Sequence, residues 1–313
     1  MENKPLISWF AIGSLGILII LGFILPSGAR SLVIQMMVFS IFAMGYDILL
    51  GFTNQCSLGH AIFFGAGAYG AILAIVSIKI GALPALGVGV GIGFAVALLV
   101  GFICVRLSEA YFVIVTAIIS SVFHLLAMDM TWLTGGDDGI TVGVPAVFLG
   151  FTEVFLSNPV VNYYFVLFFL IFTYFILIRM LKAPLGKVFV SIRENDKRAL
   201  FLGYNVFRYK LIAFVISGVF GALSGALYAL TLRYASADYF SFYWSILPIV
   251  WCLIGGLGTL VGCWIGVVLM STFQYYISAW FTYYLMIFGV LILIILRVSR
   301  KGMLGYLLSR GGR

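Results

Sequence analysis

The sequence predicts an all-α, polytopic integral membrane protein with about ten transmembrane helices. Of its 313 residues, 64% are hydrophobic and only 9% are charged, and the mean hydropathy is +1.20. Soluble domains carry about one quarter charged residues, so this chain lacks the ionic groups for a wettable surface. Apolar windows of about 20 residues, the length that crosses a bilayer core, recur from Ile7 to Leu296. We therefore expect residues 1–313 to form a single transmembrane domain.

The apolar windows give ten expected spans: residues 7–25, 31–50, 57–79, 83–105, 110–128, 160–181, 210–232, 244–259, 261–280 and 281–297. The eighth and ninth are short and interrupted by glycine, so we expect a broken or re-entrant helix in either one. The first span follows a basic residue, Lys4, and in this it resembles a secretory signal peptide. Its apolar run is too long for a signal, however, and Pro26–Arg30 is a poor cleavage site, so we expect a retained helix. Glycines with GxxxG spacing, which lets helices approach closely, occur at Gly221 and Gly225 and at Gly258, Gly262 and Gly266.

The basic residues orient these spans, because cytoplasmic loops of membrane proteins are enriched in Lys and Arg. If the N-terminus is cytoplasmic, an even number of spans places the C-terminus there too. All but three of the 18 Lys and Arg residues then lie inside, the exceptions being Arg30, Lys79 and Arg233. The net charge of +8 therefore reflects orientation and does not indicate a nucleic-acid partner.

Two loops are longer than the other connections, one on each side of the membrane. The cytoplasmic loop, residues 182–209, is strongly charged, and from Asn195 onward its pattern predicts a helix. Apolar Ala199, Leu200 and Leu202 there oppose charged neighbours. One interpretation is a surface loop held to anionic membrane lipid by its basic excess. The other is a segment that inserts into a groove of a partner protein.

The extracytoplasmic loop, residues 129–159, carries two adjacent acids between glycines, Asp137 and Asp138. Glycines at such positions favour an exposed turn. We expect the two carboxylates to be docking candidates for a basic surface of an extracytoplasmic partner protein. The alternative is that Asp137 caps a short lateral helix.

The sequence contains no recognisable catalytic or metal-binding motif, and we expect no cofactor on this chain. Gly186-Lys187 lacks the first glycine of a P-loop, which would stand at Leu181. Only two histidines occur, and the four cysteines show no CxxC spacing, so they are expected to be small buried residues. If ATP drives transport, the ATPase must be a different chain.

Polar residues gather where the second and third spans join on the cytoplasmic side: Asn54, Gln55, Ser57 and His60. Polar groups at membrane depth are costly unless satisfied, so these are candidates for the translocation pathway. The competing interpretation is that they cap helix ends. Asp47 falls near the end of its span, where we expect it to reach the interface.

Four ordered blocks of the sequence resemble the branched-chain amino acid permease family of ABC importers. The most specific is Ser191–Ala229, SIRENDKRALFLGYNVFRYKLIAFVISGVFGALSGALYA, which is similar to the family's coupling loop and following helix. The others are Gly51–Ala74, Arg106–Ile140 and Gly255–Gly266. Together they cover most of the chain, and they are more specific to the family than to the ligand.

The resemblance implies a type II-like permease within a heteromeric importer. Two related permeases form the pathway, two cytoplasmic ATPases bind ATP and Mg, and an extracytoplasmic binding protein delivers the ligand. A short helix of the inner loop would occupy a cleft of the ATPase. Ala199 and Gly203 match the EAA-type motif of such loops, whereas Lys197 stands where that motif has Glu. The implied docking residues are Arg193, Glu194, Asp196, Arg198, Ala199 and Gly203.

We call the cytoplasmic loop, residues 182–209, the docking loop. Within it, we expect Gly203 to tolerate no side chain. Either its backbone requires positive φ or the groove of the partner leaves no room. Arg193 is expected to matter less, since an exposed charge contributes little.

The expected function is passage of branched-chain amino acids across a bacterial inner membrane. An importer for urea, short amides or another small solute is an alternative from the same superfamily. An ion-coupled secondary transporter is a rival from another class, and it would carry intramembrane carboxylates or discontinuous helices that bind ions. Asp47 alone is weak support for that rival.

The topology can be tested by labelling single cysteines in a cysteine-free background. A membrane-impermeant reagent added outside should modify the Asp137→Cys variant and spare Arg193→Cys and Arg310→Cys, because basic loops stay inside. Outside labelling at position 193 would overturn the orientation.

Overall fold

The computed structural model describes residues 4–278, except residues 144, 145, 150, 151 and 157, together with residues 286 and 289. Its α-helices are α1 Lys4–Ile24, α2 Ser27–Thr53, α3 Ala61–Ile78, α4 Ala82–Cys104, α5 Glu109–Asp129, α6 Thr131–Thr134, α7 Pro159–Lys182, α8 Pro184–Glu194, α9 Asp196–Phe201, α10 Val206–Leu232, α11 Phe242–Gly255 and α12 Leu260–Ser278. Two 3-10 helices, η1 Gly136–Asp138 and η2 Ala237–Phe240, and four short strands complete these elements.

Seven of the described helices are long and apolar enough to cross a membrane: α2, α3, α4, α5, α7, α10 and α12. Two shorter apolar helices are the Gly13–Ile24 part of α1 and α11. The predicted all-α, multi-pass fold is therefore confirmed. The expected span 281–297 and position 310 lie outside the described residues, apart from Met286 and Gly289. The number ten stays a prediction.

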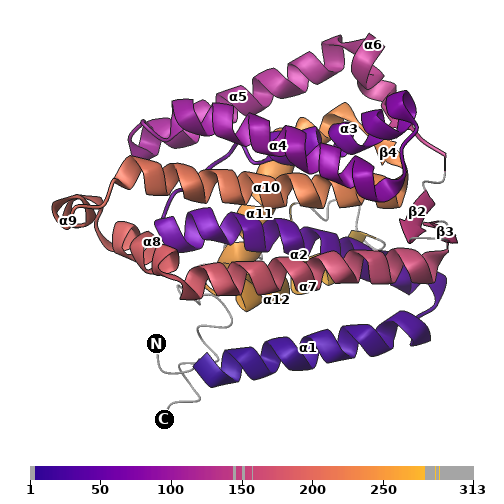
Figure 1. Cartoon of the computed structure of the whole chain (residues 1–313), viewed down its shortest axis with the longest axis horizontal. Helices are drawn as coiled ribbons and strands as arrows, with labels where there is room; N and C mark the ends of the chain where they lie inside the picture. The colour runs from indigo at the N-terminus through magenta and orange to yellow at the C-terminus, as the bar shows by residue number, and fades with distance from the viewer. Residues whose placement is uncertain are drawn as a thin grey trace.

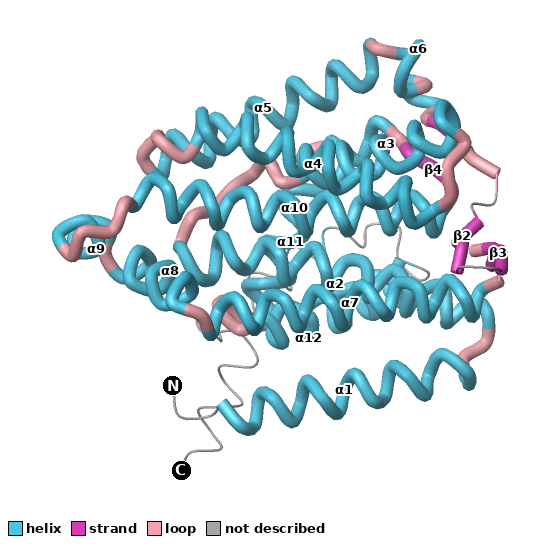
Figure 2. Tube along the Cα trace, in the orientation of Figure 1, coloured by secondary structure: helices cyan, strands magenta, loops and turns pink. Residues whose placement is uncertain are grey.

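The long helices lie side by side and run between two ends of the molecule (Figure 1). We call the end that carries α8 and α9 the α9 end, and the end that carries β2 and β3 the hairpin end. Figure 2 shows that the strands gather only at the hairpin end. Helices α2, α3 and α10 form the centre of the bundle, where Phe42, Phe63 and Phe214 are fully buried or nearly so.

Glycine allows the central helices to approach closely. A methyl group on Gly225 of α10 would overlap the carbonyl oxygen of Phe64 on α3. On α12, one on Gly266 would overlap the carbonyl oxygen of Trp251 on α11. Both glycines belong to the predicted GxxxG pairs, so the sequence correctly located these two contacts.

Two helices begin inside the bundle instead of at its ends. Helix α3 starts at Ala61, later than the expected span 57–79, because residues 54–60 form an irregular segment that returns into the protein. Helix α11 has only 14 residues, or about 21 Å at 1.5 Å per residue. The two starts meet, because the Ala61 amide donates to Ser245 Oγ at 2.9 Å. Just before α11, the carbonyl of Phe240 in η2 accepts from Ser120 Oγ of α5 at 3.2 Å.

The predicted all-helical chain contains four short strands in its connecting segments. Strand β1, Ile140–Thr141, pairs antiparallel with β4, Tyr234–Ala235. Strands β2, Ala146–Leu149, and β3, Thr152–Phe155, form an antiparallel hairpin. The β1–β4 pair ties the 129–159 loop to the segment after α10, so this loop is fixed against the bundle. No period-2 pattern had singled out these short segments.

The contact at Gly225 can be tested with Gly225→Ala. The added methyl group overlaps the Phe64 carbonyl oxygen, and overpacking of this kind costs about 1–3 kcal/mol. The midpoint of thermal unfolding of the purified protein in detergent should fall. The matched control is Gly87→Ala on α4, where no atom lies within 4 Å of the added methyl group. Equal midpoints for the two variants would contradict the close approach.

Candidate functional site

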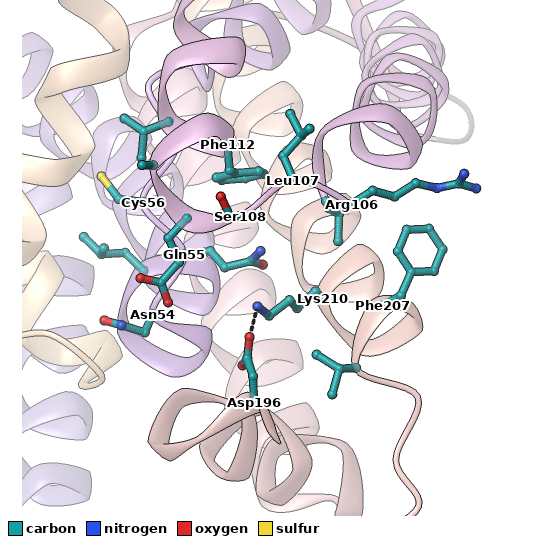
Figure 3. A pocket seen from close by; sticks show the side chains of 16 residues that line it. Asn54, Gln55, Cys56, Arg106, Leu107, Ser108, Phe112, Asp196, Phe207 and Lys210 are labelled. Atoms are coloured by element: carbon teal, nitrogen blue, oxygen red, sulfur yellow. Dashed lines mark hydrogen bonds and ion pairs between the residues drawn. The ribbon is translucent and has the colours of Figure 1, made fainter. Parts of the chain in front are cut away.

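A cavity of about 1100 Å³ opens at the α9 end between three segments (Figure 3). Residues 54–56 form one wall, the α4–α5 connection forms a second, and α9 with the start of α10 forms the third. We call this cavity the vestibule. Its polar lining includes Asn54, Gln55, Ser108, Glu109, Asp196 and Lys210, and its apolar lining includes Leu50, Phe112, Val113 and Phe207.

Three of the charged residues at the vestibule have partners within the chain. Lys210 at the start of α10 makes an ion pair with Asp196, the first residue of α9 (Figure 3). The guanidinium of Arg106 lies over the ring of Phe102, 4.2 Å from its centroid, with Phe207 at 5.2 Å. Gln55 is buried, and its Oε1 has no hydrogen-bond partner among the described residues. An amide acceptor is therefore available to a ligand donor.

The four polar residues proposed for the pathway divide into two pairs. Asn54 and Gln55 line the vestibule. Ser57 and His60, later in the same segment before α3, are fully buried. The Ser57 amide donates to the Tyr46 hydroxyl at 3.0 Å, and His60 Nε2 is hydrogen-bonded to Ser217 Oγ at 2.8 Å. These contacts stabilise the break before α3, and a pathway role for Ser57 and His60 stays a prediction.

The docking loop folds as two helices, where the sequence predicted one from Asn195 onward. Asn195 is extended and separates α8 from α9, and its side chain accepts from the Arg198 amide at 2.9 Å. Ala199 is buried against α8, but Leu200, Phe201 and Leu202 are exposed, Phe201 by 87%. The predicted apolar face is thus an apolar tip that projects from the α9 end (Figure 1).

Gly203 ends α9 with positive φ. Its φ is +88°, and no atom lies within 4 Å of the position that a Cβ would occupy. The Tyr204 amide donates to the Ala199 carbonyl at 3.2 Å, which closes the helix end. Of the two reasons that the sequence left open for Gly203, this chain by itself supplies the backbone conformation.

The contacts of Arg193 differ from those of a solvated charge. Its Nη1 donates to the carbonyl oxygen of Gly51, in the last turn of α2, at 2.6 Å. The side chain of Arg193 is exposed, as the sequence predicted, but it also reaches back to the bundle. Glu194 is exposed too at the end of α8, and both residues line a surface pocket near Asn54.

Sequence reasoning missed a buried polar cluster that includes Asp47. The carboxylate was expected at the interface, but Asp47 is fully buried, and its Oδ1 accepts from the Gly258 amide at 2.8 Å. Potential metal-ligand atoms of Asp47, Cys252 and Cys263 lie within 4.8 Å of one another. The Cys252 thiol donates to the Ala43 carbonyl at 3.3 Å, a contact that joins α11 to α2. The members of the cluster come from α2, α11 and α12, so spacing along the chain could not reveal it.

Asp137 and Asp138 lie at the hairpin end and are both exposed. They belong to η1, whose N-cap is Gly135, so Asp137 does not cap this helix. The Tyr234 hydroxyl donates to the backbone carbonyl of Asp138 at 3.2 Å, which holds the turn in place.

The chain was compared with known proteins. A model of the family "Branched-chain amino acid transport system / permease component" matches residues 28–296. The chain is 26% identical to the high-affinity branched-chain amino acid transport system permease protein LivM of Salmonella typhimurium, over 90% of this chain and 71% of that protein. It is 25% identical to LivM of Escherichia coli with the same coverage. It is also 25% identical to a probable LivM of Methanocaldococcus jannaschii, over 84% and 77%. No solved structure matches.

The family match spans the vestibule, the broken helices and the docking loop, and the predicted resemblance is thereby confirmed. The chain belongs to the permease-component family of branched-chain amino acid transport systems.

Proposed function

We propose that this chain is the membrane-spanning permease of an ATP-driven importer for branched-chain amino acids in a bacterial inner membrane. A second, related permease completes the pathway, two ATPase chains bind ATP and Mg, and an extracytoplasmic binding protein delivers the ligand. The α9 end faces the cytoplasm in this proposal, and this chain needs no cofactor of its own. The family match and the arrangement of the α9 end support it.

The observation that carries the proposal is the docking loop beside the vestibule. The tip at Leu200–Leu202 exposes apolar side chains beyond the bundle, which suits insertion into a partner groove. The same α9 helix begins at Asp196, which lines the vestibule and pairs with Lys210. A partner that moves α9 would therefore also move one wall of the vestibule.

The vestibule chemistry suits a zwitterion with an apolar side chain. Gln55 and Asn54 offer amide groups, and Phe112, Val113 and Phe207 offer apolar surface. An ion-coupled transporter would need a carboxylate exposed to the pathway. Asp47 is fully buried and accepts from Gly258, so it does not line the vestibule. Asp47 therefore gives no support to the ion-coupled rival, whose remaining candidates are the vestibule carboxylates Glu109 and Asp196.

Gly203→Leu should uncouple the importer. A side chain at positive φ costs about 1–2 kcal/mol, and the distorted end of α9 would misplace the apolar tip. In proteoliposomes with all partners, ATP-dependent leucine uptake should fall about tenfold or more, since each 1.4 kcal/mol is about a factor of ten. The variant should still reach the membrane and bind the binding protein. Normal uptake by a variant that still binds the ATPases would refute the role of this loop in coupling ATPase motion to transport.

Two further variants separate the causes at Gly203. Gly203→Asn should keep more uptake than Gly203→Ala, because Asn tolerates positive φ better than other residues. If crowding by the ATPase groove dominates instead, Ala should be milder than Asn. Competition by urea, short amides and branched-chain amino acids in the same assay identifies the ligand class.

The exposed acids at the hairpin end make a separate prediction. Changing Asp137 and Asp138 together to Asn should weaken stimulation of ATPase activity by the binding protein, because two charges for a basic partner are lost. The loss should be larger at low ionic strength, where surface charges are less screened. An unchanged salt profile would show that these acids do not dock the binding protein.

A further inference from the structure

Arg193 lies where three segments of the α9 end meet. Its Nη1 donates to the carbonyl oxygen of Gly51, in the last turn of α2, at 2.6 Å. The same atom lies 2.9 Å from the position of a Cβ on Gly258, in the turn between α11 and α12. The guanidinium therefore fills the space beside Gly258. Through one side chain, α8 contacts both α2 and the α11–α12 turn.

A buried carboxylate holds that turn from the other side. Asp47 stands one helical turn before Gly51 on α2, and its Oδ1 accepts from the Gly258 amide at 2.8 Å. Its Oδ2 has no hydrogen-bond partner among the described residues. Arg193 and Asp47 therefore contact the same turn, at Gly258, from two sides.

The turn at Gly258 is one end of a connection into the bundle. Helix α11 runs from this turn to Phe242, and its far end contacts the break before α3. There Ser245 Oγ accepts from the Ala61 amide at 2.9 Å, and Trp244 stacks on Phe64 with ring centroids 4.8 Å apart. The break before α3 belongs to the same segment whose first residues, Asn54 and Gln55, line the vestibule.

We propose that Arg193 is a positioning residue of the transport cycle, which passes displacement of α8 and α9 to α11 through Gly51 and the Asp47-bound turn at Gly258. The inference rests on the proposed importer function. Lysine at position 193 would supply charge but not the planar fork of a guanidinium, which places one nitrogen on the Gly51 carbonyl beside Gly258. The Asp196–Lys210 pair is a second connection, from α9 to α10.

The test compares Arg193→Ala, Arg193→Lys and Asp47→Asn in the complete transporter in proteoliposomes. Asn at position 47 keeps an acceptor for the Gly258 amide and removes only the charge. The matched control is Arg179→Ala, which removes an exposed cation at the end of α7, outside the docking loop. Three quantities are measured: ATPase chains co-purified with the permease, ATPase activity stimulated by the binding protein, and leucine transported per ATP hydrolysed.

We expect leucine transported per ATP hydrolysed to fall about fivefold or more in Arg193→Ala, which corresponds to the range of typical coupling free energies. Arg193→Lys should be intermediate, and Arg179→Ala should match the wild type. Adding Asp47→Asn to Arg193→Ala should cause less further loss than Asp47→Asn causes alone, because the two act through one turn. If Arg193→Ala does not accumulate in the membrane, a lowered ratio for Arg193→Lys carries the test.

An unchanged ratio of transport to hydrolysis in Arg193→Ala, or in Arg193→Lys if only that variant accumulates, would overturn the inference. Loss of the ATPase chains from Arg193→Ala would overturn it too, because Arg193 would then act in docking. Failure of the wild-type chain to associate with any ATPase would instead refute the proposed function. These outcomes are distinct, so the inference and the function can fail separately.

Discussion

A backbone amide inside a bilayer has no water to bind, so each helix that begins there must find a partner for its first amide within the protein. Helix α3 begins in the interior, and α11 satisfies this constraint for it, because the Ala61 amide donates to Ser245 Oγ. Tyr46 satisfies both backbone groups of Ser57 in the segment that leads to α3. The rest of the site depends on this meeting, because it turns residues 54–60 back beside the vestibule.

The short α11 has a mechanical consequence. A helix that crosses the whole membrane is anchored at both surfaces, whereas α11 connects a glycine turn at the α9 end to the bundle interior. The docking loop touches that turn through Arg193 and touches the vestibule through Asp196. The helices α8 and α9 thus contact both the turn at Gly258 and the vestibule. This arrangement suits a protein in which a partner outside the membrane must change a cavity within it.

The sequence by itself determined the class, the positions of nine apolar helices and the family. Hydrophobic length is a local property, and the bilayer thickness converts it directly into helices. The glycine spacing at Gly221 and Gly225 is also local, so the close helix contact was predicted correctly. The motif around Ala199 and Gly203 is local too, and the docking role that it implies stays a prediction. The need for glycine at position 203 followed from its place in the motif, and the backbone supplied the reason in its φ of +88°.

Only the tertiary structure decided which polar residues share a site. Asn54 and Ser57 are three positions apart, yet one lines the vestibule and the other is buried against Tyr46, because the chain reverses between them. Asp47 was placed at the interface by its position in a span, but the close approach of Gly258 buries it. The contacts of the exposed Arg193 with Gly51 and Gly258 could not be predicted, because both partners are distant in sequence. Contacts between distant segments arise from helix packing, and no pattern along one helix contains them.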